Sequence, residues 1–193
     1  MSIYPEKIAR KIFDDSRPGP PGDAICGRSA SFSCGCFSEA AIAVNEECQT
    51  IETLRFATNG CGFMAASGRV LEGELAGKVL AELYGLSDAA LAAKIEDELG
   101  EFPPERKQCA SVAIEALKAA FTNYRNARAC EFVGDSPLIC SCFGVSEDDL
   151  LAAIRETGAS EPKGLGRVTR AGSGCGACRM LIEELIEHVK GQA

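Results

Sequence analysis

Cysteine is the residue type through which this chain can do chemistry, because 11 of its 193 residues are cysteines. Near the C-terminus one residue separates Cys140 from Cys142, and two residues separate Cys175 from Cys178. Four thiolates of this kind can hold a structural zinc ion or an iron-sulfur cluster. The spacing therefore predicts a metal or cluster site.

Disulfides are the other use of so many cysteines, and the expected compartment argues against them. Residues 1–15 carry scattered charges and lack the apolar segment of a secretory signal. No stretch approaches the roughly 18 apolar residues of a membrane span. We therefore expect a cytoplasmic chain with reduced thiols and no membrane partner. The net charge of -8 disfavours contacts with phosphate backbones, so we expect no nucleic-acid partner.

The distal cysteines favour a cluster over zinc. Zinc modules normally use two C-x-x-C pairs separated by a shorter gap. The two irons of a 2Fe-2S cluster each need two thiolates, so unlike pairs on separate loops suit it. The glycines of AGSGCGAC, residues 171–178, let backbone N–H groups approach the sulfurs, and a helix opening at Cys178 favours an anion. Zinc and uncommitted thiols remain the alternatives.

Residues 138–189 resemble the bacterioferritin-associated ferredoxin family in this C-x-C and C-x-x-C arrangement. Members of that family are small helical domains that bind a 2Fe-2S cluster. The resemblance implies that Cys140, Cys142, Cys175 and Cys178 hold a permanent 2Fe-2S centre.

The elements that must position these residues indicate an α+β fold. A short amphipathic helix is expected within residues 4–13, and two strands of a hairpin in EAAIAV and TIETLRFAT. Three further helices are expected in the first part of the chain. One runs from just after NGCG to about residue 83, one begins after a cap at Ser87, and one runs from about residue 105 to residue 125. Buried candidates on the last helix are Val112, Leu117 and Phe121.

A change of pattern divides the chain into residues 1–127, a linker at 128–137, and a mainly helical domain at 138–193. In the second domain Ser146 is expected to cap a helix, and the final helix to present Leu181, Leu185 and Val189 on one face. A unit of about 55 residues has little core, so a metal centre would help to stabilise it.

Three more cysteines lie in settings that suit chemistry. Cys34 and Cys61 are expected at element ends, and Cys109 in the first turn of a long helix, where the N-terminus lowers a thiol's pKa. The alternative is that each is a small buried hydrophobe. We expect incidental roles for Cys26, Cys48 and Cys130, with Cys26 near enough in sequence to be a reserve ligand. The only histidine, His188, is expected to face solvent.

The segments RFATNGCGFMAASGRVLEGELAGK, FPPERKQCASVAIEALKAAFTNY and YPEKI are similar to the U-type iron-sulfur scaffold family, which includes IscU and NifU. The resemblance implies an IscU-like domain that is not an enzyme, with a small antiparallel sheet packed by helices. It also implies that Cys34, Cys61 and Cys109 assemble a transient 2Fe-2S or 4Fe-4S cluster, with Cys109 the candidate persulfide acceptor. The order of scaffold and ferredoxin-like domains is that of NifU, and we expect the third, Nfu-type domain to be lacking.

The chain departs from the family pattern at three places. The family's aspartate two residues after the first cysteine is here Cys36, and the histidine before the third cysteine is Gln108. The chaperone motif corresponds to FPPER, residues 102–106, which keeps two prolines and a final basic residue. A fourth thiolate at Cys36 suits iron better than a carboxylate does, so we expect tighter retention of the cluster.

The resemblance implies a scaffold that receives sulfur from a cysteine desulfurase together with iron, and passes a cluster to apo iron-sulfur proteins. The permanent 2Fe-2S centre would supply electrons, which makes an electron donor a further expected partner, and we expect a homodimer. One rival is a ferredoxin-like electron carrier with a docking domain. The other is a zinc-dependent sulfur acceptor for a desulfurase.

Overall fold

The computed structural model describes residues 3–13, 19–83 and 85–191, and these divide into two compact units. The first unit takes most of the described residues up to Tyr124. The second takes the chain from Arg125 onward together with the short segments 46–50 and 79–84. Each unit combines helices with a small sheet, which confirms the α+β class.

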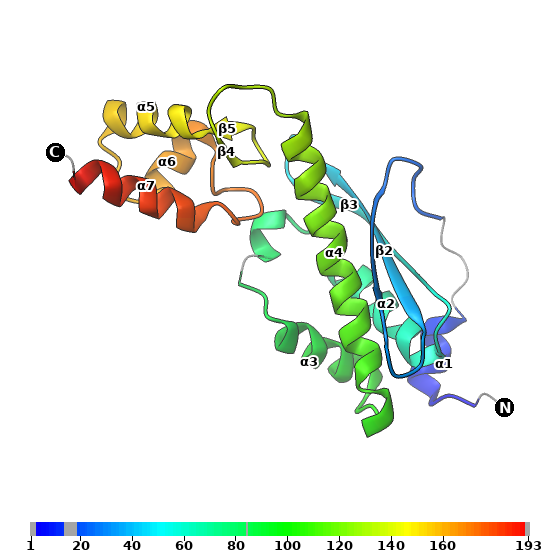
Figure 1. The fold of residues 1–193 in the computed structure, drawn as a ribbon. Helices are drawn as coiled ribbons and strands as arrows, with labels where there is room; N and C mark the ends of the chain where they lie inside the picture. The colour runs from blue at the N-terminus through cyan, green and yellow to red at the C-terminus, as the bar shows by residue number, and fades with distance from the viewer. Residues whose placement is uncertain (1–2, 14–18, 84, 192–193) are drawn as a thin grey trace. The chain divides into compact units, whose positions relative to one another are not determined.

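The first unit places a three-stranded sheet, in the order β1-β2-β3, among helices (Figure 1). Strand β1 pairs antiparallel with β2, with Ile25 opposite Ile42. From the N-terminus to Glu131 the elements in chain order are α1 Glu6–Ile12, β1 Ile25–Ala30, β2 Phe37–Asn45, β3 Thr50–Thr58, α2 Gly62–Leu75, the 3-10 helix η1 Leu80–Leu83, α3 Asp88–Leu99, the 3-10 helix η2 Pro104–Arg106, and α4 Gln108–Glu131. Of these, η1 and the end of α4 are counted with the second unit.

The core of this unit is drawn from the sheet and from the helices that face it. Ile42 of β2, Leu54 of β3, Leu71 of α2 and Ile114 of α4 are almost completely buried. Ser87 caps α3 as expected, because its side chain accepts the backbone N–H of Ala90. Burial of these aliphatic side chains provides the main favourable free energy for the fold.

Strand β1 was not predicted, because its residues show no clear alternation of apolar and polar types. It lies against α4 through Gly27: a β-carbon there would come within 1.9 Å of the Ala120 backbone nitrogen. The absence of a side chain lets the backbones of strand and helix approach closely. This contact places the end of β1 beside the start of the site described below.

Several predicted boundaries differ from the observed ones. The helix after NGCG ends at Leu75, because Gly77 turns the chain with φ +81°, and residues 80–83 form a separate 3-10 turn. Helix α4 begins only at Gln108 and continues to Glu131, so the first residues of the expected linker are helical. Val112 and Leu117 are buried, whereas Phe121 is only half-buried.

The second unit is mainly helical. It contains β4 Leu138–Cys140, β5 Val145–Ser146, α5 Glu147–Thr157, α6 Pro162–Thr169 and α7 Arg179–Gly191. Ser146 caps α5 as expected and forms a capping box with Asp149. Of the residues expected on the apolar face of α7, Leu185 and Val189 pack against the core, whereas Leu181 is 46% exposed; the most buried residues of the helix are Ile182 and Ile186. Helix α6 was not predicted, because its eight residues bury only Leu165.

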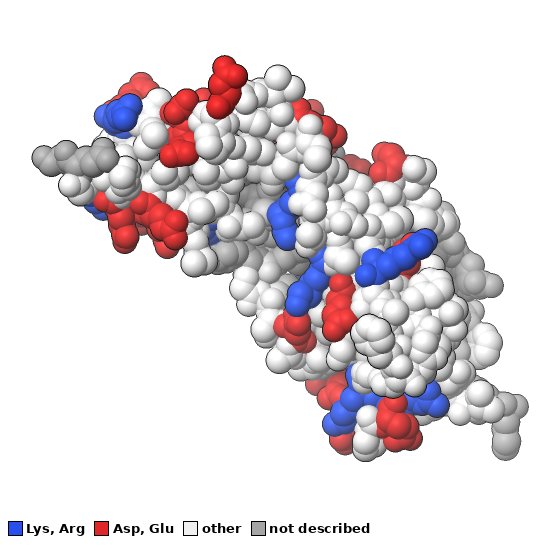
Figure 2. Space-filling model, viewed as in Figure 1, with Lys and Arg blue, Asp and Glu red and all other residues white. Residues whose placement is uncertain are grey.

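Charge is distributed unevenly over the surface. Acidic side chains gather over α5 and α7 on the face drawn in Figure 2, whereas blue and red side chains lie next to each other over the elements of the first unit. The first turn of α5 alone carries three acidic residues, which the positive end of the helix dipole favours. Within the described ranges no helix is both long enough and apolar enough to cross a membrane.

The close packing of β1 against α4 at Gly27 can be tested by comparing alanine substitutions at Gly27 and at Gly73, a glycine with open space around it. The substitution Gly27→Ala should destabilise the first unit by about 2 to 3 kcal/mol, because the new methyl group meets the α4 backbone. Gly73→Ala in α2 has no neighbour within 4 Å and should stabilise its helix by about 0.5 to 1 kcal/mol. Urea unfolding with hydrogen-exchange readout on α2 and α4 measures both changes. A Gly27→Ala variant as stable as the wild type would contradict the packing.

Candidate functional site

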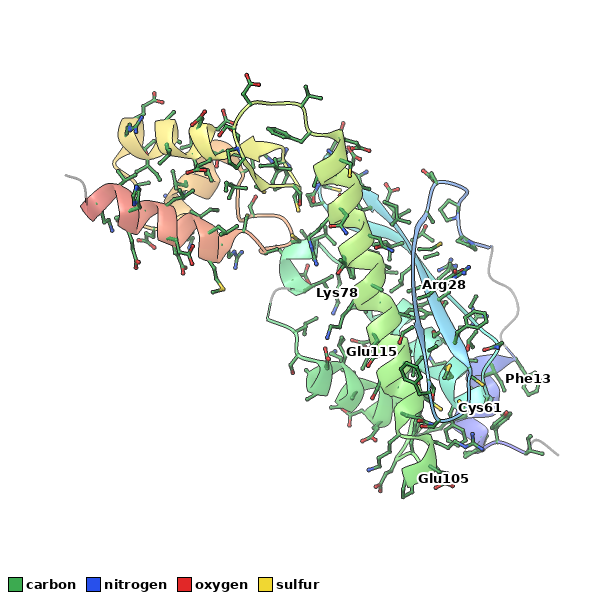
Figure 3. The ribbon with its side chains drawn as sticks, viewed as in Figure 1. Phe13, Arg28, Cys61, Lys78, Glu105 and Glu115 are labelled. Carbon is green, nitrogen blue, oxygen red and sulfur yellow. The ribbon has the colours of Figure 1, made fainter. Side chains whose placement is uncertain are left out.

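The proximal cysteines meet where two helices begin. Cys61 is the N-cap residue of α2, and Cys109 lies in the first turn of α4. Their sulfurs are 3.7 Å apart. Figure 3 shows Cys61 at the same end of α4 as Glu105, which precedes that helix. Two thiols far apart in sequence are therefore neighbours.

A tight loop after β1 carries the other two thiols. The Ser31 N–H donates to the Cys36 carbonyl at 2.8 Å, the Gly35 N–H donates to the Ser31 carbonyl at 2.8 Å, and Gly35 has φ +69°. The loop is attached to α4, because the Ser31 hydroxyl donates to Oε1 of Gln108 at 3.2 Å. Gln108 directly precedes Cys109, so this bond links the loop of Cys34 and Cys36 to the third cysteine.

The thiols of the loop and those at the helix starts influence the pKa values of one another. The pKa of Cys36 is raised, first because its thiol donates to Cys34, and a charge on Cys61 raises it further. Burial raises the pKa of Cys109 to about 12, and charges on Cys61 and Cys34 act in the same direction. Cys61 and Cys109 are thus neighbours, and Gln108 holds the loop of Cys34 and Cys36 at the start of α4, while the joint role of the four thiols as ligands stays a prediction.

Two of these thiols ionise more easily than a free cysteine. Hydrogen bonding from the Ser31 hydroxyl lowers the pKa of Cys34, which is exposed to solvent. Burial alone would raise the pKa of Cys61, but the first amides of α2, those of Phe63 and Met64, outweigh it and leave the pKa lowered. These amides lie near the sulfur without completing a capping hydrogen bond.

The expectation that its helix position lowers the pKa of Cys109 is wrong. The side chain is 2% exposed, and loss of hydration disfavours the thiolate more than the helix N-terminus favours it. Cys34 is the exposed thiol with a lowered pKa. The physical reason for choosing Cys109 as the sulfur acceptor therefore does not hold.

Arg106 is a member of the site that sequence reasoning missed. Its charge lowers the pKa of all four thiols, including Cys34 and Cys109, although it is not the largest influence on any of them. It belongs to the η2 turn ahead of α4 and is exposed. In the sequence, FPPER suggests a chaperone motif or a proline-containing helix stop, and the signal for this role of Arg106 is a basic residue three positions before Cys109.

The distal cysteines line one cavity of about 160 Å³ in the second unit. Cys140, Cys142 and Cys178 are buried, and Cys175 is half-buried. A β-carbon on Gly174 would come within 3.0 Å of the Cys142 sulfur, so only glycine fits beside it. The cavity therefore brings together the four residues expected from the spacing.

Hydrogen bonds among the distal sulfurs favour negative charge in this cavity. Thiols of Cys142 and Cys178 donate to Cys140 and lower its pKa to about 3, while the pKa values of both donors are raised. The nearby Cys142 thiol, whose one proton can serve either neighbour, also holds the pKa of Cys175 at about 6. The Cys175 N–H donates to the Cys142 sulfur at 3.5 Å. A thiolate-bound anionic cluster fits this donor set.

Side chains that are not themselves candidate ligands support the loop between α6 and α7. Arg179 donates from Nε to the Gly172 carbonyl at 2.8 Å, and the Arg170 guanidinium lies 4.1 Å from the centre of the Phe143 ring. Gly172 and Gly176 both have φ +78°, where larger residues are strained. Sequence reasoning recognised the glycines but not Arg179 or Phe143.

The remaining cysteines lie outside these two groups. Cys26 is on β1, Cys130 is near the end of α4, and Cys48 is in the turn after β2. All three are exposed. His188 faces solvent, as expected. Among the described residues, no group of three or more Cys, His, Asp or Glu side chains is arranged to bind a single metal ion.

Residues 3–131 match the family of NifU-like N-terminal domains. The chain belongs to that family. Residues 138–188 match the BFD-like 2Fe-2S binding domain. Both resemblances are thereby confirmed, as is the 2Fe-2S character of the second domain. The boundaries at 127 and 138, and the individual ligands, stay predictions.

Relatives support the same assignment. The nitrogen fixation protein NifU of a Nostoc species is 31% identical over 98% of this chain and 65% of that protein. The NifU of Azospirillum brasilense is 28% identical over 98% of this chain and 61% of its own length. The scaffold protein IscU of Escherichia coli is 33% identical over 53% of this chain and 75% of that protein. The chain thus spans less than two-thirds of the length of these NifU relatives.

The influence of Ser31 on the pKa of Cys34 can be measured through the pH dependence of Cys34 alkylation. Because the hydrogen bond lowers the thiol pKa, Ser31→Ala should shift the pH profile of Cys34 alkylation upward and slow alkylation at neutral pH roughly threefold. Iodoacetamide kinetics followed by peptide mass spectrometry measure this change.

Two control variants separate the hydroxyl's influence from its link to α4. Gln108→Leu removes the other acceptor of the Ser31 hydroxyl and leaves that hydroxyl free to donate to Cys34, so its alkylation profile should lie at or below the wild-type pH and not above it. Ser29→Ala removes a hydroxyl that bonds to Glu115 instead, and should leave Cys34 unaffected. An unshifted profile in Ser31→Ala would show that another group sets this pKa.

Proposed function

We propose that this protein is an iron-sulfur cluster assembly scaffold with a permanent 2Fe-2S centre in its second domain. The observation that carries the proposal is the convergence of Cys61 and Cys109, 3.7 Å apart, with the Cys34 and Cys36 loop that Gln108 holds beside them. Soft thiolates suit iron-sulfur clusters, and the site lies partly open to solvent.

The proximal thiols divide the work according to exposure. Cys34 is accessible and ionises readily, so it is the residue that accepts sulfane sulfur from a cysteine desulfurase. Cys61 and Cys109 are less exposed and hold the incoming iron. Arg106 favours the negative charge that accumulates as thiolates and sulfide gather. The assembled cluster is cargo, which passes to apo iron-sulfur proteins.

Cys36 serves as a fourth ligand and slows release of that cargo. Its position in the tight turn with Cys34 places a second soft donor on the same loop. A carboxylate there would bind iron less strongly than sulfur in a cluster. The proximal site therefore retains its cluster longer than one with an aspartate at this position.

The distal cysteines provide the resident centre. Cys140, Cys142, Cys175 and Cys178 would hold a 2Fe-2S cluster, which supplies one electron at a time when bound. The amides around the sulfurs and the near-complete burial of three of the cysteines keep water from these ligands. Carrying the centre on the same chain raises its effective concentration at the first site. An electron donor and a second copy of the chain are further proposed partners.

Anaerobic reconstitution with ferrous iron, sulfide and reductant tests the assignment. Cys61→Ser and Cys109→Ser should lose the iron and sulfide of the first domain and keep those of the second. Cys26→Ser and Cys130→Ser are matched controls and should keep both. Metal analysis and Mössbauer spectra measure the contents. Full iron loading of the Cys61→Ser and Cys109→Ser variants, or zinc in place of iron in the wild type, would contradict the proposal.

The contribution of Cys36 to retention of the proximal cluster can be measured once that cluster has formed. In the chemically reconstituted chain, Cys36→Asp should transfer its cluster to an apo-ferredoxin roughly tenfold faster than the wild type, because oxygen is the weaker ligand. Circular dichroism of the acceptor gives the rate, and Cys48→Ser is the control. Equal rates for Cys36→Asp and the wild type would remove Cys36 from the ligand set.

A further inference from the structure

The loop of Cys34 and Cys36 places two thiols one residue apart at an exposed turn. Cys34 is exposed and Cys36 is half-buried, and the neighbouring Phe32 is fully exposed. Backbone bonds between Ser31 and Cys36 and between Gly35 and Ser31 close the turn. Residues two apart span at most about 7 Å, and the left-handed Gly35 shortens this distance.

The Cys36 thiol is directed toward its neighbour. Its sulfur donates to the Cys34 carbonyl at 3.8 Å, across the turn formed by Gly35. Cys61 and Cys109 face each other instead, and Cys109 is almost completely buried. Cys36 is therefore the thiol best placed to react with a group carried on Cys34.

We propose that Cys36 is a resolving thiol, which converts sulfane sulfur bound to Cys34 into sulfide inside the assembly site. The inference rests on the proposed scaffold function and adds a reductive step to it. Sulfur arrives on Cys34 as a persulfide, and a cluster requires sulfide, which is two electrons more reduced. The two thiols of one turn can provide both electrons.

The step balances without an outside reagent. The Cys36 sulfur attacks the Cys34 sulfur and forms the Cys34–Cys36 disulfide, while the bond from Cys34 to the sulfane sulfur breaks. The electron pair of that bond leaves on the sulfane atom, and the proton of Cys36 joins it as hydrosulfide. Each thiol sulfur is oxidised by one electron, and the sulfane sulfur is reduced by two.

The turn also explains how the pair is restored. A disulfide across a single glycine closes a small ring at the surface, where a reductant can reach it. A dithiol supplies two electrons and two protons and regenerates both thiols; a one-electron carrier acting twice supplies the two electrons, and the protons then come from water. Cys34 and Cys36 are then free to bind iron. Sulfide is thus produced before all four thiols become ligands.

A single-turnover experiment on the full chain tests the step. The reduced, iron-free chain is mixed anaerobically with persulfide-loaded cysteine desulfurase freed of excess cysteine. The wild type should release one sulfide per persulfide accepted, and peptide fragmentation should locate a Cys34–Cys36 disulfide. Cys36→Ser should keep the extra sulfur on Cys34 and release sulfide at least roughly tenfold more slowly. Cys26→Ser should behave as the wild type.

The inference is overturned if Cys36→Ser releases sulfide at the wild-type rate, or if the disulfide is found between Cys61 and Cys109. Reconstitution of the wild type with ferrous iron and inorganic sulfide bypasses the persulfide. If that reconstitution succeeds while Cys36→Ser releases sulfide normally, the scaffold function stands and the resolving role is lost. If reconstitution loads no iron at the proximal thiols, the scaffold function itself fails.

Discussion

The proximal site depends on how closely the backbone of β1 lies against the backbone of α4. At Gly27 no β-carbon could be accommodated beside Ala120, so strand and helix are in direct contact. Ser31 follows β1 immediately, and its bond to Gln108 attaches the cysteine loop to the start of α4. One close contact between backbones therefore brings Cys34 and Cys36 toward Cys61 and Cys109, although the sequence separates them widely.

The two cysteine groups differ in exposure, and this difference corresponds to their proposed roles. The distal sulfurs are mostly buried, share hydrogen bonds and line one cavity, as a resident centre requires. The proximal sulfurs range from exposed Cys34 to buried Cys109 and differ in how easily they ionise. A graded set of thiols suits a site in which sulfur enters, is reduced and leaves as part of a cluster.

Much of the architecture could be predicted from local patterns. The caps at Ser87 and Ser146, the strands of β2 and β3 and the existence of α4 follow from side-chain chemistry within a few residues. Strand β1 could not be predicted in this way, because its residues do not alternate clearly and its place depends on the contact of Gly27 with the distant helix α4. Helix α6 could not be predicted either, because it is only eight residues long and buries only Leu165.

The amino-acid order alone predicted the distal group of cysteines, because ligand spacing and glycine-rich settings are local properties of the chain, whereas the proximal group was implied by the resemblance to the scaffold family. The amino-acid order could not show that Cys109 ionises reluctantly, that Arg106 acts on all four proximal thiols, or that Gln108 anchors the loop. These features depend on burial and on distances between residues far apart in sequence. Folding sets both, since hydration and electrostatic interaction are determined by position in space and not along the chain.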